Sequence, residues 1–289
     1  MKNLSDISVI KDVMTRHGFT FSKALGQNFI VNPSVCPRIA DDGGARSGVC
    51  ALEIGAGVGI LTAELAERAD KVVCIELDER LLPVLDETLA DFDNVKIINQ
   101  DVLKCDLKKI IKENFGDSPF VVCANLPYYI TSPVIMKLLE ERIGAESVTV
   151  MVQKEAAERL CAPVGSRDAG AVTVAVNFYA EAQKLFNVSR GSFMPSPKED
   201  SAVIRLDIRH EPPIKVQNEK FFFSMVKAAF AQRRKTAPNS LSSGMSIPKE
   251  TVLNALRNGG FSETVRPESL TMQELGLLCT ELYSLTDKE

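Results

Sequence analysis

The fold is decided by the stretch Phe120-Val121-Val122-Cys123-Ala124-Asn125-Leu126-Pro127-Tyr128. Its first five residues form an apolar run, rich in β-branched and aromatic side chains, that is entered through Pro119. Such a run predicts a buried central strand of a parallel sheet. Because α/β sheets bind ligands just beyond the carboxyl ends of their strands, we expect residues 125–128 to lie at a functional site.

Each of these four residues suits the recognition of a nucleobase. The side-chain oxygen of Asn125 can accept a hydrogen bond from an exocyclic amine. Pro127 has no N–H and a fixed φ, so it holds the Leu126 carbonyl in an extended geometry. Tyr128 offers a flat face on which a base can stack. Taken alone, a strand that ends in an ordinary proline-containing turn explains the four residues equally well.

A second predicted strand, residues 49–54, runs directly into Gly55-Ala56-Gly57-Val58-Gly59. Apolar residues at helical spacing follow, which predicts a strand–turn–helix unit whose backbone can approach a ligand closely. A dinucleotide-binding loop has its third glycine one position later, at Ile60, so pyrophosphate binding is disfavoured. Glu53, just before the loop, suits a ligand with a cationic amino-acid group. A purely structural turn is the alternative.

Two further strand ends carry a carboxylate. Glu76 ends the predicted strand 72–75, about 20 residues beyond the glycines, where related folds hold ribose hydroxyls. Asp101 follows the predicted strand 95–98 and can accept from an adenine amine, while Val102 donates its backbone N–H to the ring. Each carboxylate alone is explained equally well by a helix cap. Together with the glycines they suit a nucleoside without phosphates.

Composition excludes several classes of protein. The chain has 289 residues, a hydrophobic content of 45%, a charged content of 25% and a net charge of −4, as in ordinary globular proteins. No apolar run approaches the roughly 20 residues of a membrane span. The first residues lack the apolar region of a signal peptide, so we expect a cytoplasmic protein. Seven cysteines without a C-x-x-C pair and two histidines disfavour a disulfide framework and a metal site.

Glu211-Pro212-Pro213 is the expected boundary between a domain of residues 1–210, with a helical extension over 1–20, and a helical domain of residues 211–289. Residues 221–249 contain no acidic residue. A local basic patch on an acidic protein favours docking to one nucleic-acid feature, although a solvated helix face is the common explanation. The basic residues of this segment are Lys227, Arg233, Arg234, Lys235 and Lys249.

Three other segments carry expectations. Residues 23–30 are predicted to be a lid over the pocket or a surface turn. Residues 171–179 and 201–208 are predicted to be strands that form a hairpin-like pair. The proline-stiffened loop 193–198 is expected to expose Phe193, which could form the second face of a base-stacking sandwich or a hydrophobic plug.

Eight motifs then occur in the order found in a known enzyme family. They are 25–29 (Leu-Gly-Gln-Asn-Phe), 53–59, 75–78 (Ile-Glu-Leu-Asp), 100–101, 125–128, 153–155 (Gln-Lys-Glu), 193–198 with 200–203, and 230–236. Through them the chain resembles the small-subunit rRNA adenine N6,N6-dimethyltransferases of the KsgA/RsmA family over essentially its full length. Each motif alone is moderately specific, whereas all eight in order are strongly so.

The resemblance implies an α/β fold, with a Rossmann-like class I methyltransferase domain that uses S-adenosyl-L-methionine and a small all-α C-terminal domain. It implies N6,N6-dimethylation of two adjacent adenosines in the 3′-terminal hairpin loop of small-subunit (16S) rRNA, coupled to small-subunit maturation. The expected partner is this rRNA or the immature small ribosomal subunit. A monomer without membrane association is expected.

The resemblance also assigns the site residues by motif. Asn28 and Ile30 are expected to close over the cofactor, Glu76 to hold its ribose hydroxyls and Asp101 its adenine amine. The cofactor-binding set is Gln27, Asn28, Ile30, Glu53, Gly55, Gly57, Glu76, Leu77, Asp101, Val102 and Asn125. The catalytic set is Asn125, Leu126, Pro127, Tyr128 and Phe193, and the RNA-binding set is Lys227, Arg233, Arg234 and Lys235.

The groups present predict an in-line methyl transfer to a base that is turned out of its stack. Hydrogen bonds from the adenine amine to the Asn125 side-chain oxygen and the Leu126 carbonyl would aim the nitrogen lone pair at the methyl group. Three alternatives stay open: a resistance-type enzyme that methylates one adenosine of large-subunit rRNA, a non-catalytic ribosome-assembly binder, and a nicotinamide-dependent oxidoreductase. Complete segments 191–198 and 230–236 favour the small-subunit interpretation, and Glu76 and Asp101 disfavour a pure binder.

Overall fold

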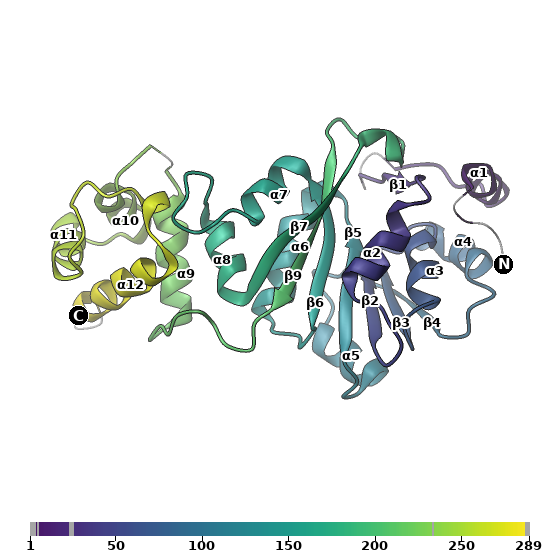
Figure 1. Ribbon diagram of the computed structural model, residues 1–289, viewed down its shortest axis with the longest axis horizontal. Coiled ribbons are helices and arrows are strands. Elements are labelled where there is room, and N and C mark those ends of the chain that lie inside the picture. Colours follow the sequence, from purple (N-terminus) through teal and green to yellow (C-terminus); the bar gives the residue numbers. More distant parts are fainter. Residues whose placement is uncertain (1–3, 5, 23–25, 233, 287–289) are drawn as a thin grey trace. The chain divides into compact units, whose positions relative to one another are not determined.

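The computed structural model describes residues 4, 6–22, 26–232 and 234–286 (Figure 1). The chain forms two units, one of residues 1–157 and 182–208 and one of residues 158–181 and 209–289. The later break lies close to the boundary expected at residue 210. Residues 158–181, which were expected in the N-terminal domain, group instead with the C-terminal helices.

The first unit is built on a seven-stranded sheet in the order β4-β3-β2-β5-β6-β9-β7 (Figure 1). The strands from β4 to β6 are parallel neighbours, and β9 is antiparallel to β6. At the end of β2, Ile54 lies opposite Ile75 of β3 and Ala124 of β5, so three strands end together. The bounds are β2 Cys50–Ile54, β3 Val72–Glu76, β4 Val95–Asn99, β5 Phe120–Asn125, β6 Ser147–Gln153, β7 Ala180–Val188 and β9 Ser201–Ile208.

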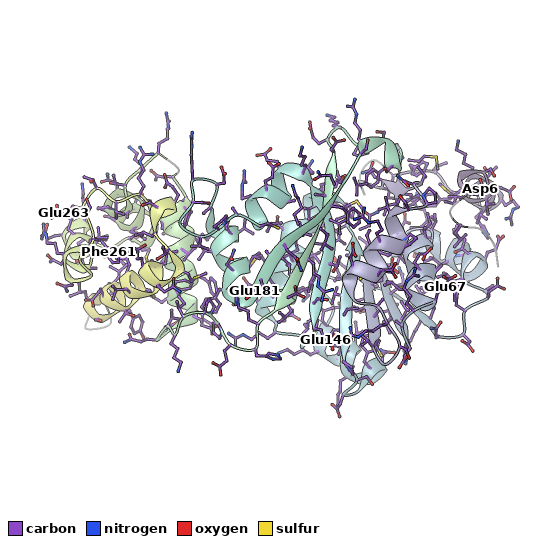
Figure 2. All side chains as sticks on the ribbon, viewed as in Figure 1. Asp6, Glu67, Glu146, Glu181, Phe261 and Glu263 are labelled. Carbon is purple, nitrogen blue, oxygen red and sulfur yellow. The ribbon has the colours of Figure 1, made fainter. Side chains whose placement is uncertain are left out.

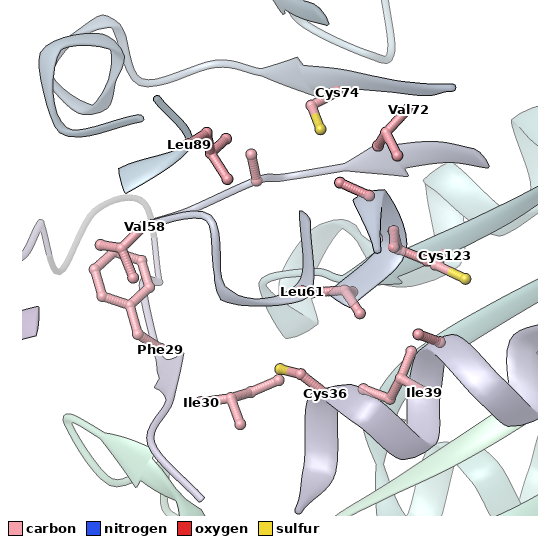
Figure 3. Packing of buried hydrophobic residues seen from close by; sticks show 14 of the residues in the cluster. Phe29, Ile30, Cys36, Ile39, Val58, Leu61, Val72, Cys74, Leu89 and Cys123 are labelled. Atoms are coloured by element: carbon pink, nitrogen blue, oxygen red, sulfur yellow. The ribbon is translucent and has the colours of Figure 1, made fainter. Parts of the chain in front are cut away.

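Strand β5 confirms the prediction of a buried central strand. Val121 and Cys123 join the hydrophobic cluster on one face of the sheet, while Val122 and Ala124, which alternate with them, are equally buried. Figure 3 shows part of that cluster, including Cys123 together with Ile39 and Leu61 of the helices that cover this face. A strand covered on both faces reads as a continuous apolar run, which is why its sequence identified it.

Helices connect these strands and begin where their sequences favour a cap or a proline. Asp6, Asp78 and Asp106 each accept a backbone N–H in the first turn that follows them. The helical segments of this unit are α1 Ile7–Arg16, α2 Val35–Gly43, α3 Ile60–Ala66, η1 Glu79–Leu81, α4 Leu82–Thr88, α5 Leu107–Phe115, α6 Tyr128–Glu140, α7 Lys154–Leu160 and η2 Arg190–Ser192. A two-stranded antiparallel ladder joins β1 (Phe29–Ile30) to β8 (Phe193–Met194).

The predicted strand over residues 171–179 is wrong, because these residues form the helix α8 (Ala171–Tyr179). Val174, Val176 and Phe178 are all buried, and the Phe178 ring packs 5.5 Å from that of Phe222. A short, mostly apolar run has too little periodicity to separate helix from strand, and tertiary packing overrides its β-branched composition. The predicted strand over 201–208 is confirmed as β9, which lies between β6 and β7 in the sheet, so the predicted hairpin-like pair with residues 171–179 does not form.

The second unit is helical, as expected of the C-terminal region. Besides α8, it contains the helices α9 to α12, and each of these four contributes a buried residue to the core. These residues are Phe222, Leu241, Leu256 and Leu275. Pro238 lies in the first turn of α10, where a proline is tolerated. The segments are α9 Glu219–Phe230, α10 Ala237–Met245, α11 Lys249–Asn258, η3 Pro267–Ser269 and α12 Met272–Thr286.

Charged side chains cover the outside of both units. Figure 2 shows exposed carboxylates such as those of Glu67 and Glu146 in the first unit and Glu263 in the second. Within the described part of the chain, no helix combines the length and the apolar character needed to cross a membrane.

Candidate active site

A cleft of about 1070 Å³, open at its mouth, lies in the first unit beyond the carboxyl ends of β2, β3 and β5. The place agrees with the general position of ligand sites in open α/β sheets. The cleft is lined by every residue assigned from the sequence to the cofactor and to catalysis. These are Gln27, Asn28, Ile30, Glu53, Gly55, Gly57, Glu76, Leu77, Asp101, Val102, Asn125, Leu126, Pro127, Tyr128 and Phe193.

The glycine loop forms the floor of the cleft. Gly57 has a φ of 59°, and a Cβ at this position would lie 3.3 Å from the Phe29 ring. Its backbone N–H donates to Glu76 Oε2 at 3.0 Å. The loop therefore needs glycine here both for its left-handed conformation and for the close approach of β1.

Glu76, at the end of β3, is buried beside this loop. Its Oε1 accepts the backbone N–H of Asp78 at 2.9 Å, in addition to the bond from Gly57. Burial raises the pKa of this carboxyl, although backbone hydrogen bonds from Asp78, Gly57 and Leu77 oppose the rise. A carboxylate has about four acceptor sites, so these three donors leave capacity for a hydroxyl group of a ligand.

Glu53 is 1% exposed and lies one residue before the end of β2. The Cys74 thiol donates to its Oε2 at 3.2 Å, and Thr62 also bonds to it. Burial raises the pKa of this carboxyl to about 7. A buried carboxylate without a cationic partner is unstable, so a cationic ligand group in the cleft would compensate it.

Asp101 is already engaged within its own turn. Its Oδ1 accepts the Leu103 backbone N–H at 3.0 Å, and Lys104 Nζ lies 3.5 Å from Oδ2. Val102 is buried beneath it, and Leu77 is exposed at the cleft mouth. The Leu103 contact closes a turn, and the next helix, α5, begins at Leu107 with Asp106 as its cap, so the helix-cap alternative for Asp101 is wrong. The carboxylate keeps further acceptor sites.

Asn125 is held at the end of β5 by the segment that precedes β1. Its Nδ2 donates to the backbone carbonyl of Asn28 at 3.4 Å, which leaves Oδ1 as an acceptor for a ligand. Pro127 has φ −53° and ψ 133°, and Thr131 Oγ1 donates to its carbonyl at 3.1 Å. The sharp turn from strand into α6 is therefore fixed by the proline and by a side chain one helical turn later.

Tyr128 and Phe193, two of the aromatic residues that line the cleft, are held in place by the protein. The Tyr128 hydroxyl lies 2.6 Å from Ser201 Oγ, and burial raises the pKa of this phenol. The expectation that Phe193 is exposed is wrong: it is 5% exposed and belongs to the hydrophobic cluster of the first unit, which agrees with the hydrophobic-plug alternative. Tyr129, which we did not select from the sequence, lines the cleft and is 59% exposed. A tyrosine directly after the motif was the available signal.

Residues 18–262 match the family described as ribosomal RNA adenine dimethylase. The chain belongs to this family. Among its relatives, "Ribosomal RNA small subunit methyltransferase A" of Geobacillus thermodenitrificans is 46% identical over 288 residues, or 98% of each chain. The protein of the same name from Alkaliphilus oremlandii is 44% identical and covers 98% of this chain and 99% of its own.

Solved structures agree with this membership in the adenine dimethylase family. A dimethyladenosine transferase from Plasmodium falciparum superposes with a TM-score of 0.75, is 26% identical and covers 89% of this chain and 98% of its own. The 23S rRNA methyltransferase ErmE has a TM-score of 0.66 and 29% identity, with 88% and 99% covered. The fold is the Rossmann-like class I methyltransferase fold expected from the sequence.

The methyl donor of the dimethylase family, S-adenosyl-L-methionine, fits the groups that line the cleft. Glu53 is a buried carboxyl suited to the cationic amino-acid moiety, and Glu76 keeps an acceptor site suited to a ribose hydroxyl. Gly55 and Gly57 present backbone without side chains.

The basic residues assigned to RNA lie in the second unit of this dimethylase. Lys227 is exposed on α9, and Arg234 and Lys235 are exposed between α9 and α10. Arg233 lies outside the described residues. The sequence interpretation of these residues as an RNA-binding surface stays a prediction.

Proposed function

We propose that this protein uses S-adenosyl-L-methionine to dimethylate the N6 atoms of two adjacent adenosines in the 3′-terminal hairpin loop of small-subunit (16S) rRNA. The observation that carries the proposal is the anchoring of Asn125, whose amide nitrogen is occupied by the Asn28 carbonyl. Its side-chain oxygen is thereby oriented as an acceptor at the end of β5. An acceptor fixed at this point suits an exocyclic amine.

The chain's own residues act by positioning. Bound S-adenosyl-L-methionine supplies an electrophilic methyl group. Asn125 Oδ1 and the Leu126 carbonyl accept the two N–H groups of adenine N6, which makes the nitrogen pyramidal and aims its lone pair into the cleft. The buried surroundings of Leu126 exclude water from this point. An amine readily releases its proton after methylation, so no side chain has to act as a strong base.

The target base has to leave its stack, and aromatic residues at the cleft replace the lost stacking. Tyr128 is held by Ser201, and Phe193 is held by the β1–β8 ladder, so both rings are preorganised. Tyr129 is exposed at the same cleft and is available to a flanking base. We assign the target adenine to Tyr128 and Phe193 and a neighbouring base to Tyr129.

The choice of small-subunit rRNA is supported by the relatives. Those named small subunit methyltransferase A are 46% and 44% identical over nearly full length, whereas the 23S enzyme ErmE is 29% identical. We further propose that the immature small ribosomal subunit in the cytoplasm is the partner, that the protein acts as a monomer, and that Lys227, Arg233, Arg234 and Lys235 contact its phosphates.

Methyl transfer from labelled S-adenosyl-L-methionine to small ribosomal subunits that lack this modification tests the proposal. Wild type should place label in N6,N6-dimethyladenosine at two neighbouring positions, and Asn125→Ala should lose it. Asn187→Ala, at an exposed site on β7, is the matched control and should retain the activity. Labelling of large-subunit rRNA instead would establish the resistance-type alternative, and cofactor binding without any label would favour the assembly binder.

A further inference from the structure

Gln27 lines the cofactor cleft, yet both ends of its side-chain amide are bound by protein. Its Oε1 accepts the backbone N–H of Ser22 at 2.9 Å. Its Nε2 donates to Asp78 Oδ2 at 2.8 Å. The side-chain amide of Gln27 is therefore not free to bind the cofactor directly. Its contact with Asp78 indicates that it positions the segment in which it lies.

Asp78 joins three parts of the site. It is 6% exposed, and its carboxylate also accepts Arg80 Nε at 2.8 Å and Arg80 Nη2 at 2.6 Å. The bonds from Arg80 keep the pKa of Asp78 below its ordinary value, so it is ionised at neutral pH. Its backbone N–H donates to Glu76 Oε1. Asp78 thus connects Gln27 to the end of β3 and to the carboxylate proposed to hold ribose.

The segment 26–30 is tied down on the opposite side of the cleft as well. The Asn28 carbonyl accepts Asn125 Nδ2 at the end of β5, and Ile30 pairs with Phe193. The strand order β3-β2-β5 places β2 and its glycine loop between these two attachment points. Phe29, between them in sequence, lies 3.3 Å from a Cβ built on Gly57. The segment therefore crosses the end of β2.

We propose that Asp78 is a positioning residue of the cofactor site, which acts by holding Gln27 and so keeps the segment 26–30 across the cleft. Opening of this segment removes Asn28 and Ile30 from the cofactor and frees the amide of Asn125 to rotate. The inference rests on the cofactor site of the proposed function. It does not depend on which RNA is methylated.

A purely structural role for Asp78 is the competing explanation, because its Oδ1 also accepts the Arg80 N–H at the start of η1. An exchange of the two partners separates the explanations. Gln27→Glu places two carboxylates in contact, and Asp78→Asn replaces the anion by an amide. The double variant Gln27→Glu/Asp78→Asn again pairs one carboxylate with one amide, in the opposite direction. The asparagine Oδ1 can still accept the Arg80 backbone N–H, so a cap role alone predicts that Gln27→Glu has no effect and rescues nothing.

Calorimetric titration of the RNA-free protein with S-adenosyl-L-methionine and with S-adenosylhomocysteine measures the cofactor Kd. Hydrogen exchange of the ligand-free protein measures the opening of residues 26–30. Each single variant should bind about tenfold more weakly, the size expected of one charge-assisted hydrogen bond, and should exchange faster in this segment. The double variant should return to within about threefold of the wild-type Kd. Asp106→Asn, the same substitution at the cap of α5, is the control for loss of a carboxylate charge at a helix cap and should change neither measurement.

Two results would overturn the proposal: single variants that bind like wild type, or a double variant no better than the weaker single. If the charged variants fail to fold, Gln27→Ala removes the bond to Asp78 without adding a charge, and its Kd and exchange decide. All these measurements omit RNA. Failure of the rRNA proposal alone would therefore leave them unchanged.

Discussion

Replacing Glu53 with glutamine is expected to stabilise the ligand-free protein at alkaline pH and to flatten its pH dependence. Glu53 is buried against Cys74 and Thr62, and burial raises its pKa from 4.5 to about 7. In the unfolded chain the same carboxyl titrates near its ordinary value. The folded state therefore binds this proton more tightly than the unfolded state does. Its contribution to stability is complete below the unfolded pKa and is lost as the pH rises through the folded pKa.

The size of the effect follows from the two pKa values. At about 1.4 kcal/mol per unit, the wild-type protein loses about 2.5 kcal/mol of unfolding free energy through this carboxyl between about pH 5 and about pH 8. Glutamine keeps an oxygen that can accept from the Cys74 thiol, and its amide can donate to Thr62. Since it cannot ionise, the variant should lose none of that free energy. It should also bind S-adenosyl-L-methionine more weakly, because the cationic amino-acid group loses its partner.

Urea denaturation of the ligand-free protein, followed by circular dichroism at both pH values, measures the difference. Titrating groups that do not interact with Glu53 are common to wild type and variant and cancel in the comparison. Glu67→Gln, at an exposed site at the end of α3, is the control and should keep the wild-type pH dependence. If wild type and Glu53→Gln lose equal amounts of unfolding free energy between the two pH values, the reasoning is refuted. Such a result would mean that the pKa of the Glu53 carboxyl is the same in the folded and the unfolded protein.

Three further outcomes are expected. Tyr129→Ala should raise the KM for the ribosomal substrate by roughly 5- to 100-fold, the range of one base–aromatic stack, while Tyr129→Phe stays near wild type in the same methylation assay. The double variant Lys227→Ala/Lys235→Ala should weaken RNA binding and lower the slope of log K against log salt by about 0.7–0.9 for each phosphate that the protein no longer neutralises, as measured by filter binding. Gly244→Ala should destabilise the second unit by about 1–3 kcal/mol in thermal unfolding, because a Cβ there would lie 2.6 Å from that of Ala228.

Some features of the site follow from short-range sequence patterns. The run 120–124 and the glycines after residue 54 predicted two strand ends, and the structure aligns those ends at one edge of the sheet. Parallel strands bring their carboxyl ends together whatever their order, so residues as distant as Glu76 and Asn125 could be assigned to one cleft. Order of motifs, not any single motif, supported the family.

Other features could not be predicted from the sequence, because they depend on contacts between segments that are distant in the chain. Residues 171–179 are mostly apolar and lack a clear period, so their helix is decided by packing against Phe222 rather than by periodicity. Phe193 is buried because β8 finds β1, more than 160 positions away in the chain. The prediction for the loop 193–198 rested on the neighbouring prolines alone, which carry no information about this distant strand. Tyr128 and Tyr129 are identical in type and adjacent in sequence, yet Tyr128 is bonded to Ser201 and Tyr129 is exposed. The local sequence does not show which of the two is exposed.

By itself, the sequence determined the fold class, the family and the position of the cofactor cleft, because strand burial, glycine turns and motif order are properties of local chain segments. Tertiary structure alone decided which side chains reach the cleft freely and which are already occupied by protein. Gln27, Asp78 and Asn125 illustrate the difference, since their roles depend on hydrogen bonds between segments separated by tens of residues. Such bonds form only when the sheet has placed its strand ends side by side, and no local pattern encodes them.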